Sequence, residues 1–221
     1  EWEPVYEQIL DSFGFGRTGD EMARDVLATL VTPFDRTRVA WDEQTVAICG
    51  AAPTLRDELS RLDEADVVVA ASTAADVVRD AGYELDMMVT DLDKNPETAV
   101  ALTESGVPVA AAAHGDNVPA LREWVPQFQD EHVLGTTQAE PVGPVVNWGG
   151  FTDGDRAAFI ADELGAGRLV FAGWDFDDPA VDEMKAQKLA WAERLLAWLE
   201  RRRDEQFSVL DGRRDGIEPL P

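Results

Sequence analysis

The stretch MMVTDLDKNPETAVALTESGVPVAAAAHGDN, residues 87–117, decides the fold class of this 221-residue chain. It contains two short apolar or β-branched runs, Met87–Thr90 and Val107–Ala112, and a segment with helical spacing between them, Glu97–Ser105. A strand, a helix and a second strand in this order form a βαβ unit, in which the two strands are parallel. The stretch therefore predicts a mostly parallel sheet with helices packed on its faces.

The same alternation continues on both sides of this stretch. Runs with strand character occur at Thr45–Cys49, Val67–Ala70, Val145–Trp148 and Leu169–Ala172. Helical spacing predicts further helices at Thr54–Leu62, Ala74–Ala81, Asp155–Leu164 and about Ala180–Arg203. We therefore expect a Rossmann-like α/β fold, with a catalytic domain over residues 41–203.

The two ends of the chain differ from this central part. Residues 1–40 predict a small N-terminal helical segment, because their apolar residues follow helical spacing. A second helix within this segment is expected to begin near Asp20, a suitable N-cap residue, and to stop at Pro33. Residues 204–221 form a polar C-terminal tail, to which we assign no function.

The chain is strongly acidic, with 44 acidic and 19 basic residues and a formal net charge of −25. This charge argues against a nucleic acid or an anionic membrane as a partner, because both would repel the protein. The acidic residues are spread along the whole chain, and only three of the basic residues are lysines. Molar salt screens such self-repulsion, since the Debye length then falls to about 3 Å. The composition therefore predicts a cytoplasmic protein of a halophile.

Several other classes of protein are excluded by the sequence. A single cysteine, Cys49, excludes an internal disulfide framework and a cysteine-based zinc cluster, and two histidines leave little room for a histidine-rich metal site. No apolar run reaches the length of about 18 residues that a membrane span needs, and we see no signal segment. Gly14–Gly19 matches the dinucleotide motif G-x-G-x-x-G but follows a helical segment, and no P-loop motif is present. Any nucleotide chemistry is therefore expected to use a metal and carboxylates.

Aspartates follow four of the predicted strands. The segments concerned are Asp91–Asp93, His114–Asn117, Gly149–Arg156 and Gly173–Phe176. Ligands of open α/β sheets bind beyond the carboxyl ends of the strands. We therefore expect the functional site to lie where these segments meet.

Asp91 and Asp93 are the first candidates for metal ligands. Their spacing at a strand end allows both carboxylates to face one point, as a hard cation such as Mg²⁺ requires. Asp116 supplies a third carboxylate for the same cation. A lone D-x-D is also typical of an Asx turn or a helix cap. His114, beside Asp116, is equally compatible with a ligand-binding loop and with a satisfied core histidine.

The segment Thr152–Arg156 predicts the start of a helix. Thr152 is a suitable N-cap, and Asp153 and Asp155 suit the positive end of the helix dipole. The same helix start offers free N–H groups to a phosphate, and Arg156 adds a cation there. An arginine so early in a helix opposes the dipole, so its position indicates a bound anion. A phosphate site predicts that Arg156→Ala weakens turnover without loss of stability, whereas a capping role predicts the reverse.

In these motifs the chain resembles an archaeal family, the MptE-like 6-hydroxymethyl-7,8-dihydropterin pyrophosphokinases, which are related to thiamine pyrophosphokinase. The resemblance covers about residues 2–200. It is carried by VTDLD (Val89–Asp93), HGDN (His114–Asn117), GGFTDGDRA (Gly149–Ala157), WDF (Trp174–Phe176) and DSFGFG (Asp11–Gly16). It implies a thiamine-pyrophosphokinase-like fold.

The resemblance also implies a reaction and a set of site residues. Diphosphate would pass from ATP to the hydroxymethyl group of a reduced pterin, giving the pterin diphosphate and AMP for folate or methanopterin biosynthesis. Asp91, Asp93 and Asp116 would hold Mg²⁺, and Asp116 and Arg156 would serve catalysis. The implied nucleotide- and phosphate-binding residues are Gly50, His114, Asn117, Thr152, Asp153, Gly154 and Asp155. The oligomeric state is open, with a homodimer as one alternative.

The chain departs from the family pattern at four places. The first strand end reads Gly50-Ala51-Ala52-Pro53-Thr54, where a glycine is expected before the proline and a serine after it, and Ser72 lies where Asp-Gly is usual. Lys94 follows the D-x-D where a glycine is common, and Trp174 replaces a usual methionine. Larger side chains at positions where the family has glycine would leave less room for a bound phosphate or pterin.

Two functions from other classes stay open at this point. One is a D-x-D glycosyltransferase that uses a nucleotide sugar and a divalent metal, although HGDN and FTDGDR would then lack a role. The other is a non-catalytic module that binds ATP without turning it over. Release of AMP would exclude both.

Overall fold

A six-stranded parallel sheet forms the centre of the computed structural model, which describes residues 1–221. The strands lie in the order β5-β4-β3-β2-β1-β6. Their bounds are β1 (Thr45–Cys49), β2 (Val67–Ala71), β3 (Met87–Thr90), β4 (Val109–Ala113), β5 (Val133–Thr137) and β6 (Arg168–Ala172). Every pair of neighbours is parallel, so the predicted α/β class is confirmed.

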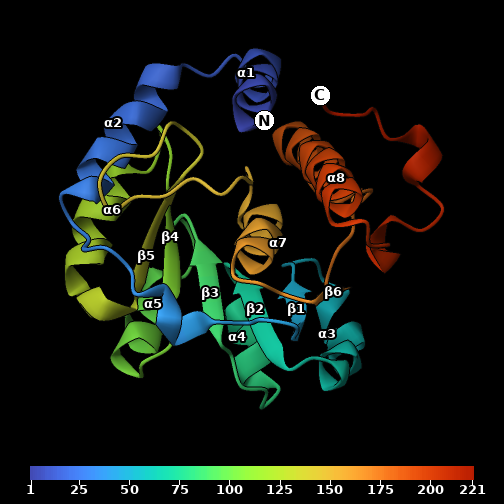
Figure 1. The fold of residues 1–221 in the computed structure, drawn as a ribbon, viewed down its shortest axis with the longest axis horizontal. Coiled ribbons are helices and arrows are strands. Elements are labelled where there is room, and N and C mark those ends of the chain that lie inside the picture. The colour runs from blue at the N-terminus through green and yellow to red at the C-terminus, as the bar shows by residue number, and fades with distance from the viewer.

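Helices cover both faces of this sheet (Figure 1). The first face carries α2 (Arg17–Ala28), α3 (Leu55–Glu58), α4 (Ala74–Asp80), α5 (Pro96–Glu104) and α6 (Val118–Trp124). The second face carries α1 (Trp2–Phe13), α7 (Asp153–Glu163) and α8 (Glu183–Arg203). Short 3₁₀ helices lie at Arg36–Val39, Leu59–Glu64, Val125–Gln127, Asp130–His132, Ser208–Leu210 and Arg214–Gly216.

Side chains alternate between two apolar cores because successive strand residues point to opposite faces. In β1, Val46 and Ile48 belong to the core under α7 and α8, whereas Ala47 and Cys49 belong to the core under α3 to α6. Cys49 is fully buried as a free thiol. The two-sided burial explains why the strands are continuous apolar runs in the sequence.

The ends of the chain pack onto these same cores. In α1, Val5 and Ile9 are fully buried against α7 and α8. In the C-terminal segment, Phe207 and Leu210 are also fully buried in that core, and Leu220 is nearly so. Residues 204–221 are therefore a packed part of the protein despite their polar composition. The division of the chain at residues 40 and 203 stays a prediction.

One predicted strand is wrong. Val145–Trp148 is not a strand of the sheet, and β5 is formed by Val133–Thr137 instead. Gly135 interrupts the apolar pattern of β5. It is closely packed, since a Cβ at Gly135 would lie 3.0 Å from the Val31 side chain. Val146 only runs beside β5, where its N–H donates to Gly135 and its carbonyl accepts from Thr137. This short pairing explains the strand-like pattern around Val145.

Two helices also differ from what the sequence predicted. Gly16 is the N-cap of α2, and Asp20 lies within its first turn, buried, so the expected capping role of Asp20 is wrong. The helix α6 was not expected from the sequence, since it is short and begins with Val118-Pro119. Both differences concern the segments around the carboxyl edge of the sheet.

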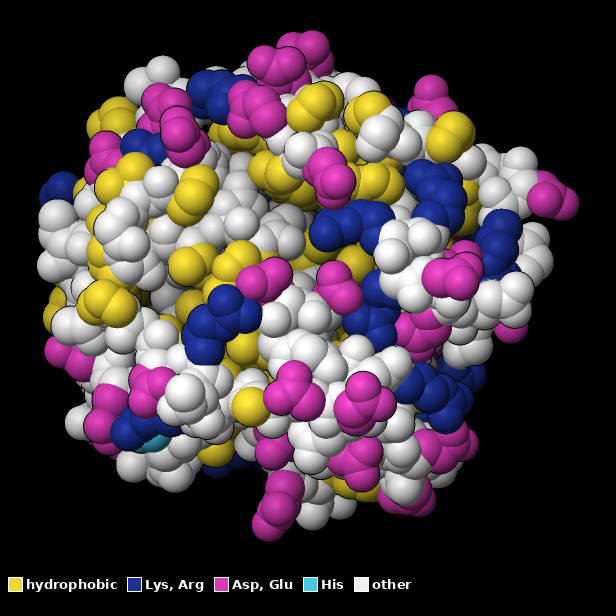
Figure 2. Space-filling model, viewed as in Figure 1, with side chains coloured by type: hydrophobic (Ala, Val, Ile, Leu, Met, Phe, Trp, Pro, Cys, Tyr) yellow, Lys and Arg dark blue, Asp and Glu magenta, His cyan; other side chains and the backbone are white.

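Figure 2 shows acidic side chains over both the upper and the lower parts of the visible face. None of the helices combines the length and the apolar character that crossing a membrane requires.

Candidate active site

A cleft with a volume of about 540 Å³ lies at the carboxyl edge of the sheet. Its walls come from the loops after β1, β2, β3, β4 and β6 and from the starts of α7 and α8. The lining includes Gly50, Ser72, Thr73, Asp91, Asp93, Lys94, His114, Phe151, Thr152, Asp153, Gly154, Trp174, Asp175, Lys185 and Lys188. The structure thus brings together the four motif segments that the sequence singled out.

The order of the strands explains why the cleft opens here. The chain leaves β1 toward α3 on one face of the sheet, and it leaves neighbouring β6 toward α8 on the other face. Loops that diverge in this way leave a crevice at the carboxyl ends of the two strands. The crevice between β1 and β6 is the floor of the cleft.

Two glycines allow the β1 and β6 loops to cross at this floor. The Gly50 N–H donates to the Ala172 carbonyl at 2.8 Å, and the Ala52 N–H donates to the Gly173 carbonyl at 3.0 Å. A Cβ at Gly50 would lie 2.5 Å from the Gly173 oxygen, and Gly173 has a φ of 73°. Neither position accommodates a side chain without a backbone shift. Gly50, a predicted phosphate-binding residue, therefore lies in the cleft.

The D-x-D segment turns sharply after β3. The Thr90 hydroxyl accepts from the Leu92 N–H at 2.9 Å, and Asp91 Oδ1 accepts from the Asp93 N–H at 3.2 Å. Leu92 has a φ of 67° and is buried in the core, which leaves the two aspartates facing the cleft. The Asx turn and the paired carboxylates, which the sequence presented as alternatives, are both present.

The two carboxylates differ in electrostatic environment. Burial raises the pKa of Asp91, but hydrogen bonds from His114 and with Asp93 outweigh it and hold this pKa well below its usual range. Burial and the neighbouring Asp91 raise the pKa of Asp93. The pair thus concentrates negative charge at one point of the cleft.

Asp153, the first residue of α7, is a third carboxylate of the same cleft. Burial, followed by the charge of Asp91, raises its pKa well above the usual range. Asp116 does not line the cleft and is exposed, with its N–H near the His114 ring. The structure therefore groups Asp153, rather than Asp116, with Asp91 and Asp93.

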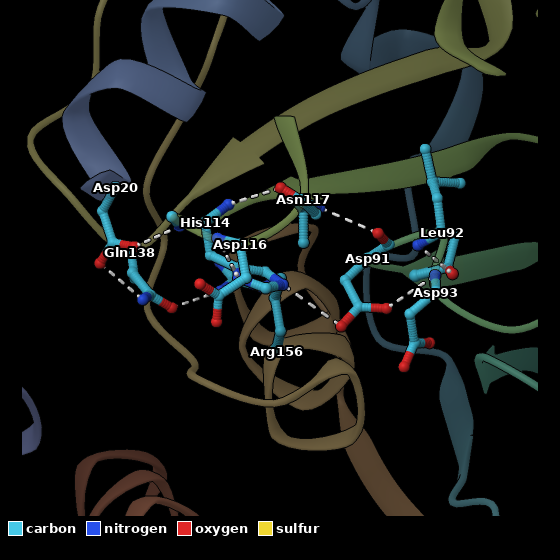
Figure 3. A network of polar contacts seen from close by, with 12 residues as sticks. Asp20, Asp91, Leu92, Asp93, His114, Asp116, Asn117, Gln138 and Arg156 are labelled. Carbon is cyan, nitrogen blue, oxygen red and sulfur yellow. Dashed lines mark hydrogen bonds and ion pairs between the residues drawn. The ribbon is translucent and has the colours of Figure 1, made fainter. Parts of the chain in front are cut away.

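The HGDN segment connects the ends of β3 and β4 (Figure 3). The Asn117 amide nitrogen donates to the carbonyls of Asp91 at 2.9 Å and Ala112 at 2.7 Å, and its oxygen accepts from the His114 N–H at 3.0 Å. His114 Nε2 lies 3.4 Å from Asp91 Oδ2. Asn117 thus positions the loop from within the wall, whereas His114 reaches the cleft itself.

The start of α7 is a capped helix terminus. Asp155 is fully buried and accepts from the Phe151 N–H at 2.5 Å, the Thr152 N–H at 2.9 Å and the Thr152 hydroxyl. These bonds occupy the Asp155 carboxylate, which does not line the cleft. Thr152, Asp153 and Gly154 do line it. A ligand can therefore approach the first turn of α7 but not Asp155.

Arg156 points away from the cleft into the protein. It is only 2% exposed and donates to the Thr137 carbonyl at 3.1 Å and to Gln138 Oε1 at 3.5 Å. Burial lowers its pKa, against the charges of Asp155, Asp153, Asp20 and Asp91. Its Nε has no hydrogen-bond partner. The Arg156 side chain is thus buried and does not line the cleft.

A buried polar network that was not expected from the sequence extends from Arg156 to the N-terminal helices (Figure 3). Asp20 accepts from the Tyr6 hydroxyl and from the Gln138 amide, both at 2.7 Å, and from the Gly115 N–H at 2.8 Å. Burial and the bond to Asp20 raise the pKa of Tyr6 above its usual range. The network ties α1 and α2 to the loops that follow β4 and β5. Sequence periodicity carries no signal for contacts of this kind, since they join distant residues.

Trp174 forms an aromatic wall of the cleft. Its Nε1 donates to the Ile48 carbonyl at 3.0 Å, and its ring packs on the first turn of α7, where a Cβ at Gly154 would lie 2.8 Å from it. Phe171 and Phe176 both contact the Trp174 ring, with centroids 5.8 Å away in each case. The large Trp174 side chain therefore fills the space beside Gly154 and gives the cleft an apolar wall there.

Comparison with known proteins assigns the chain to a family. The family model of 6-hydroxymethylpterin diphosphokinase MptE-like proteins matches residues 21–180. The chain belongs to this family. Residues 21–180 of this MptE-like protein contain all the cleft segments described above except the last turn before α8 and α8 itself.

Three curated members of the MptE-like family are similar to the chain over almost its whole length. Each is named 6-hydroxymethyl-7,8-dihydropterin pyrophosphokinase. The protein of Methanothermobacter thermautotrophicus is 40% identical, with 92% of this chain and 95% of the relative covered. The protein of Pyrococcus furiosus is 36% identical, with 90% and 93% covered. The protein of Methanocaldococcus jannaschii is 28% identical, with 94% and 98% covered.

A solved structure shares the fold. The MAf glycosyltransferase from Magnetospirillum magneticum AMB-1 superposes with a TM-score of 0.53 and 18% sequence identity, over 84% of this chain. The chain spans only 34% of that larger protein. The likeness supports the Rossmann-like architecture and carries no information on activity.

Proposed function

We propose that the protein transfers a diphosphate group to the hydroxymethyl group of 6-hydroxymethyl-7,8-dihydropterin. ATP is the donor, Mg²⁺ is the required cation, and the reaction takes place in the cytoplasm. The observation that carries this proposal is membership of the MptE-like family, together with relatives named for this activity along nearly the full chain. The cleft with Asp91 and Asp93 is the proposed site.

The residues of the cleft fit a divalent cation that arrives with a nucleotide. No three His, Cys, Asp or Glu side chains form a closed metal site. Mg²⁺ is usually bound by one or two carboxylates together with substrate phosphates and water. Asp91 and Asp93 supply such carboxylates. The pKa of Asp93 is raised by burial and by the neighbouring Asp91, and a bound cation would oppose this shift. Asp153, at the start of α7, is a further carboxyl group of the same cleft.

The proposed reaction is a displacement at phosphorus. The hydroxymethyl oxygen of the pterin forms a bond to the β-phosphorus of ATP and loses its proton. The bond from that phosphorus to the oxygen bridging the α- and β-phosphates breaks, and AMP leaves with the bonding electrons. The bound cation supplies neutralisation of phosphate charge. The protein contributes mainly positioning and electrostatics, which is typical of phosphoryl transfer.

Each group of cleft residues has a role in this proposal. Asp91 and Asp93 hold the cation, and Asn117 keeps their loop in place by bonding the Asp91 carbonyl. Gly50 lets the β1 and β6 loops cross at the floor of the cleft, and Gly154 lets Trp174 pack on the start of α7. Arg156 supports the site from behind, by balancing the charge of Asp153 and Asp155.

The direct experiment is to incubate the protein with ATP, Mg²⁺ and reduced hydroxymethylpterin and to measure AMP. Formation of AMP and pterin diphosphate in equal amounts is the expected result. Thiamine serves as the competing acceptor, and EDTA serves as the test of the cation. AMP formation that persists in EDTA would remove the metal from the proposal.

The two alternatives from other classes make different predictions in the same experiment. A glycosyltransferase would release a nucleoside diphosphate from a nucleotide sugar and no AMP from ATP. A binding module would retain ATP unchanged in the presence of the pterin. Either outcome would overturn the proposed activity.

A further inference from the structure

The three lysines of the chain all line the cleft. Lys94 follows the D-x-D segment directly, and Lys185 and Lys188 lie in the first two turns of α8. Every other basic residue, histidine apart, is an arginine, and no arginine lines the cleft. Histidine apart, lysine is thus the basic residue of the cleft, and arginine is the basic residue of the rest of the protein. Lysine differs from arginine as a compact charge with three freely rotating donors.

None of these three ammonium groups has a partner in the protein. Eleven arginines form ion pairs with carboxylates, whereas no lysine does. In a chain with 44 acidic residues, pairing a surface cation is easily achieved. Three unpaired cations in one cleft therefore leave their hydrogen-bonding capacity to a ligand.

The lysines also lie close enough to affect one another and the aspartates. Partial desolvation by the cleft walls, and then the neighbouring Lys94 and Lys188, lower the pKa of Lys185. Lys94 and Lys188 act in turn on Asp93, and Lys185 acts on Asp153. Lysine and aspartate side chains thus line the same cleft without forming ion pairs with one another. A lone anion would be repelled by the aspartates, and a lone cation would be repelled by the lysines.

The ligand that matches this pattern carries both signs. A polyphosphate with a bound divalent cation presents anionic oxygens to the lysines and positive charge to the carboxylates. We propose that Lys94, Lys185 and Lys188 form a polyphosphate-binding wall, which holds the phosphate chain of the diphosphate donor between α8 and the β3 loop. This inference rests on the proposed function for the identity of the donor. It adds α8, outside the segment matched by the family model, to the substrate site.

The first test measures binding without catalysis. Inorganic tripolyphosphate with Mg²⁺ is titrated into the protein in a calorimeter, in the absence of any pterin or nucleoside. The double variant K185A/K188A should bind at least about tenfold more weakly than the wild type, and K185R/K188R should lose less, since it keeps the charge. Melting temperatures of all variants verify folding, which these surface changes should preserve.

The matched control removes two positive charges elsewhere. Arg79 and Arg122 are exposed, lie in the last turns of α4 and α6, and form no ion pair. R79A/R122A should bind tripolyphosphate within about twofold of the wild type, because both charges lie outside the cleft. Equal affinity of K185A/K188A and wild type, or an equal loss in R79A/R122A, would overturn the lysine wall.

A second measurement separates this inference from the proposed function. The KM for ATP in AMP formation should rise in K185A/K188A, in parallel with the loss of tripolyphosphate binding. If the wild type forms AMP and the variant keeps its KM, the lysine wall is wrong and the proposed function stands. If the wild type forms no AMP but binds tripolyphosphate through Lys185 and Lys188, the lysine wall stands and the proposed function is wrong.

Discussion

Arg156 donates a hydrogen bond to the carbonyl oxygen of Thr137, the last residue of β5, at 3.1 Å. This bond carries the guanidinium from the start of α7 across to the neighbouring edge of the sheet. The charges of Asp155, Asp153 and Asp20 favour the protonated form of the same side chain, against the effect of burial on its pKa. We therefore expect Arg156 to support the site from inside the protein instead of contacting a phosphate directly.

Arg156→Ala should lower the stability of the protein. The substitution removes the hydrogen bonds to the Thr137 carbonyl and to Gln138, and it removes the cation beside Asp153 and Asp155. The free energy of unfolding should fall by about 2–4 kcal/mol as a result. Turnover of the molecules that stay folded should fall less than about tenfold, because the guanidinium does not reach the cleft. Melting temperature and AMP formation are the two measurements. An unchanged melting temperature with abolished turnover would return Arg156 to a phosphate site.

The two carboxylates of the D-x-D turn should be essential, and that of the HGDN loop should not. Asp91→Asn and Asp93→Asn should each reduce AMP formation at least about 100-fold at saturating Mg²⁺. Asp116→Asn is the matched control, since Asp116 is exposed outside the cleft, and it should stay within about threefold of the wild type. Circular dichroism verifies that all three fold. Near wild-type turnover in both D-x-D variants would remove them from the metal site.

Gly50→Ala should damage both the fold and the site. The added Cβ would lie 2.5 Å from the Gly173 oxygen, so the β1 and β6 loops must separate. Such overpacking costs about 1–3 kcal/mol and should lower the melting temperature by about 2–4 °C for each kcal/mol. Gly216→Ala, where no atom lies within 4 Å of the added Cβ, is the control and should change stability by less than about 0.5 kcal/mol. Equal melting temperatures for the two variants would show that the loops can relax freely.

Salt should stabilise the protein. With a net charge of −25, the folded chain repels itself more strongly than the expanded one, and added ions screen this repulsion. The melting temperature should rise by at least about 4 °C between low salt and about 2 M KCl, a shift that corresponds to roughly 1–2 kcal/mol at this size. Thermal unfolding monitored across a KCl series provides the measurement. A flat melting temperature would contradict the expected adaptation to concentrated salt.

Local pattern was sufficient to predict most of the sheet. Met87–Thr90 and Thr45–Cys49 were predicted with their observed bounds, because a strand buried on both faces is an unbroken apolar run. Val133–Thr137 was missed because Gly135 lies in its middle, where a Cβ would crowd the side chain of Val31 from a distant segment. A residue chosen for a long-range contact carries no local strand signal.

The site residues that come directly after strands in the chain could be predicted from the sequence. Asp91, Asp93 and His114 line the cleft because carboxyl ends of parallel strands meet at one edge. Asp155 and Arg156 belong to the same motif but turn inward, since their side-chain directions depend on the packing of α7 against the sheet. Lys185 and Lys188 were not recognised because the sequence does not tell which edge of the sheet α8 approaches.

The burial of Cys49 gives the chain an internal chemical reporter. Its thiol lies fully enclosed at the end of β1, directly before Gly50 at the cleft floor, and burial raises its pKa to about 12. Alkylating reagents attack the thiolate, so the folded protein should be inert to iodoacetamide near pH 8 and become reactive only when β1 is uncovered. Because no other cysteine competes, the rate of labelling counts openings of this one strand. A ligand in the cleft that holds the β1 loop in place should therefore slow the alkylation of Cys49, and the labelling rate would reveal its binding.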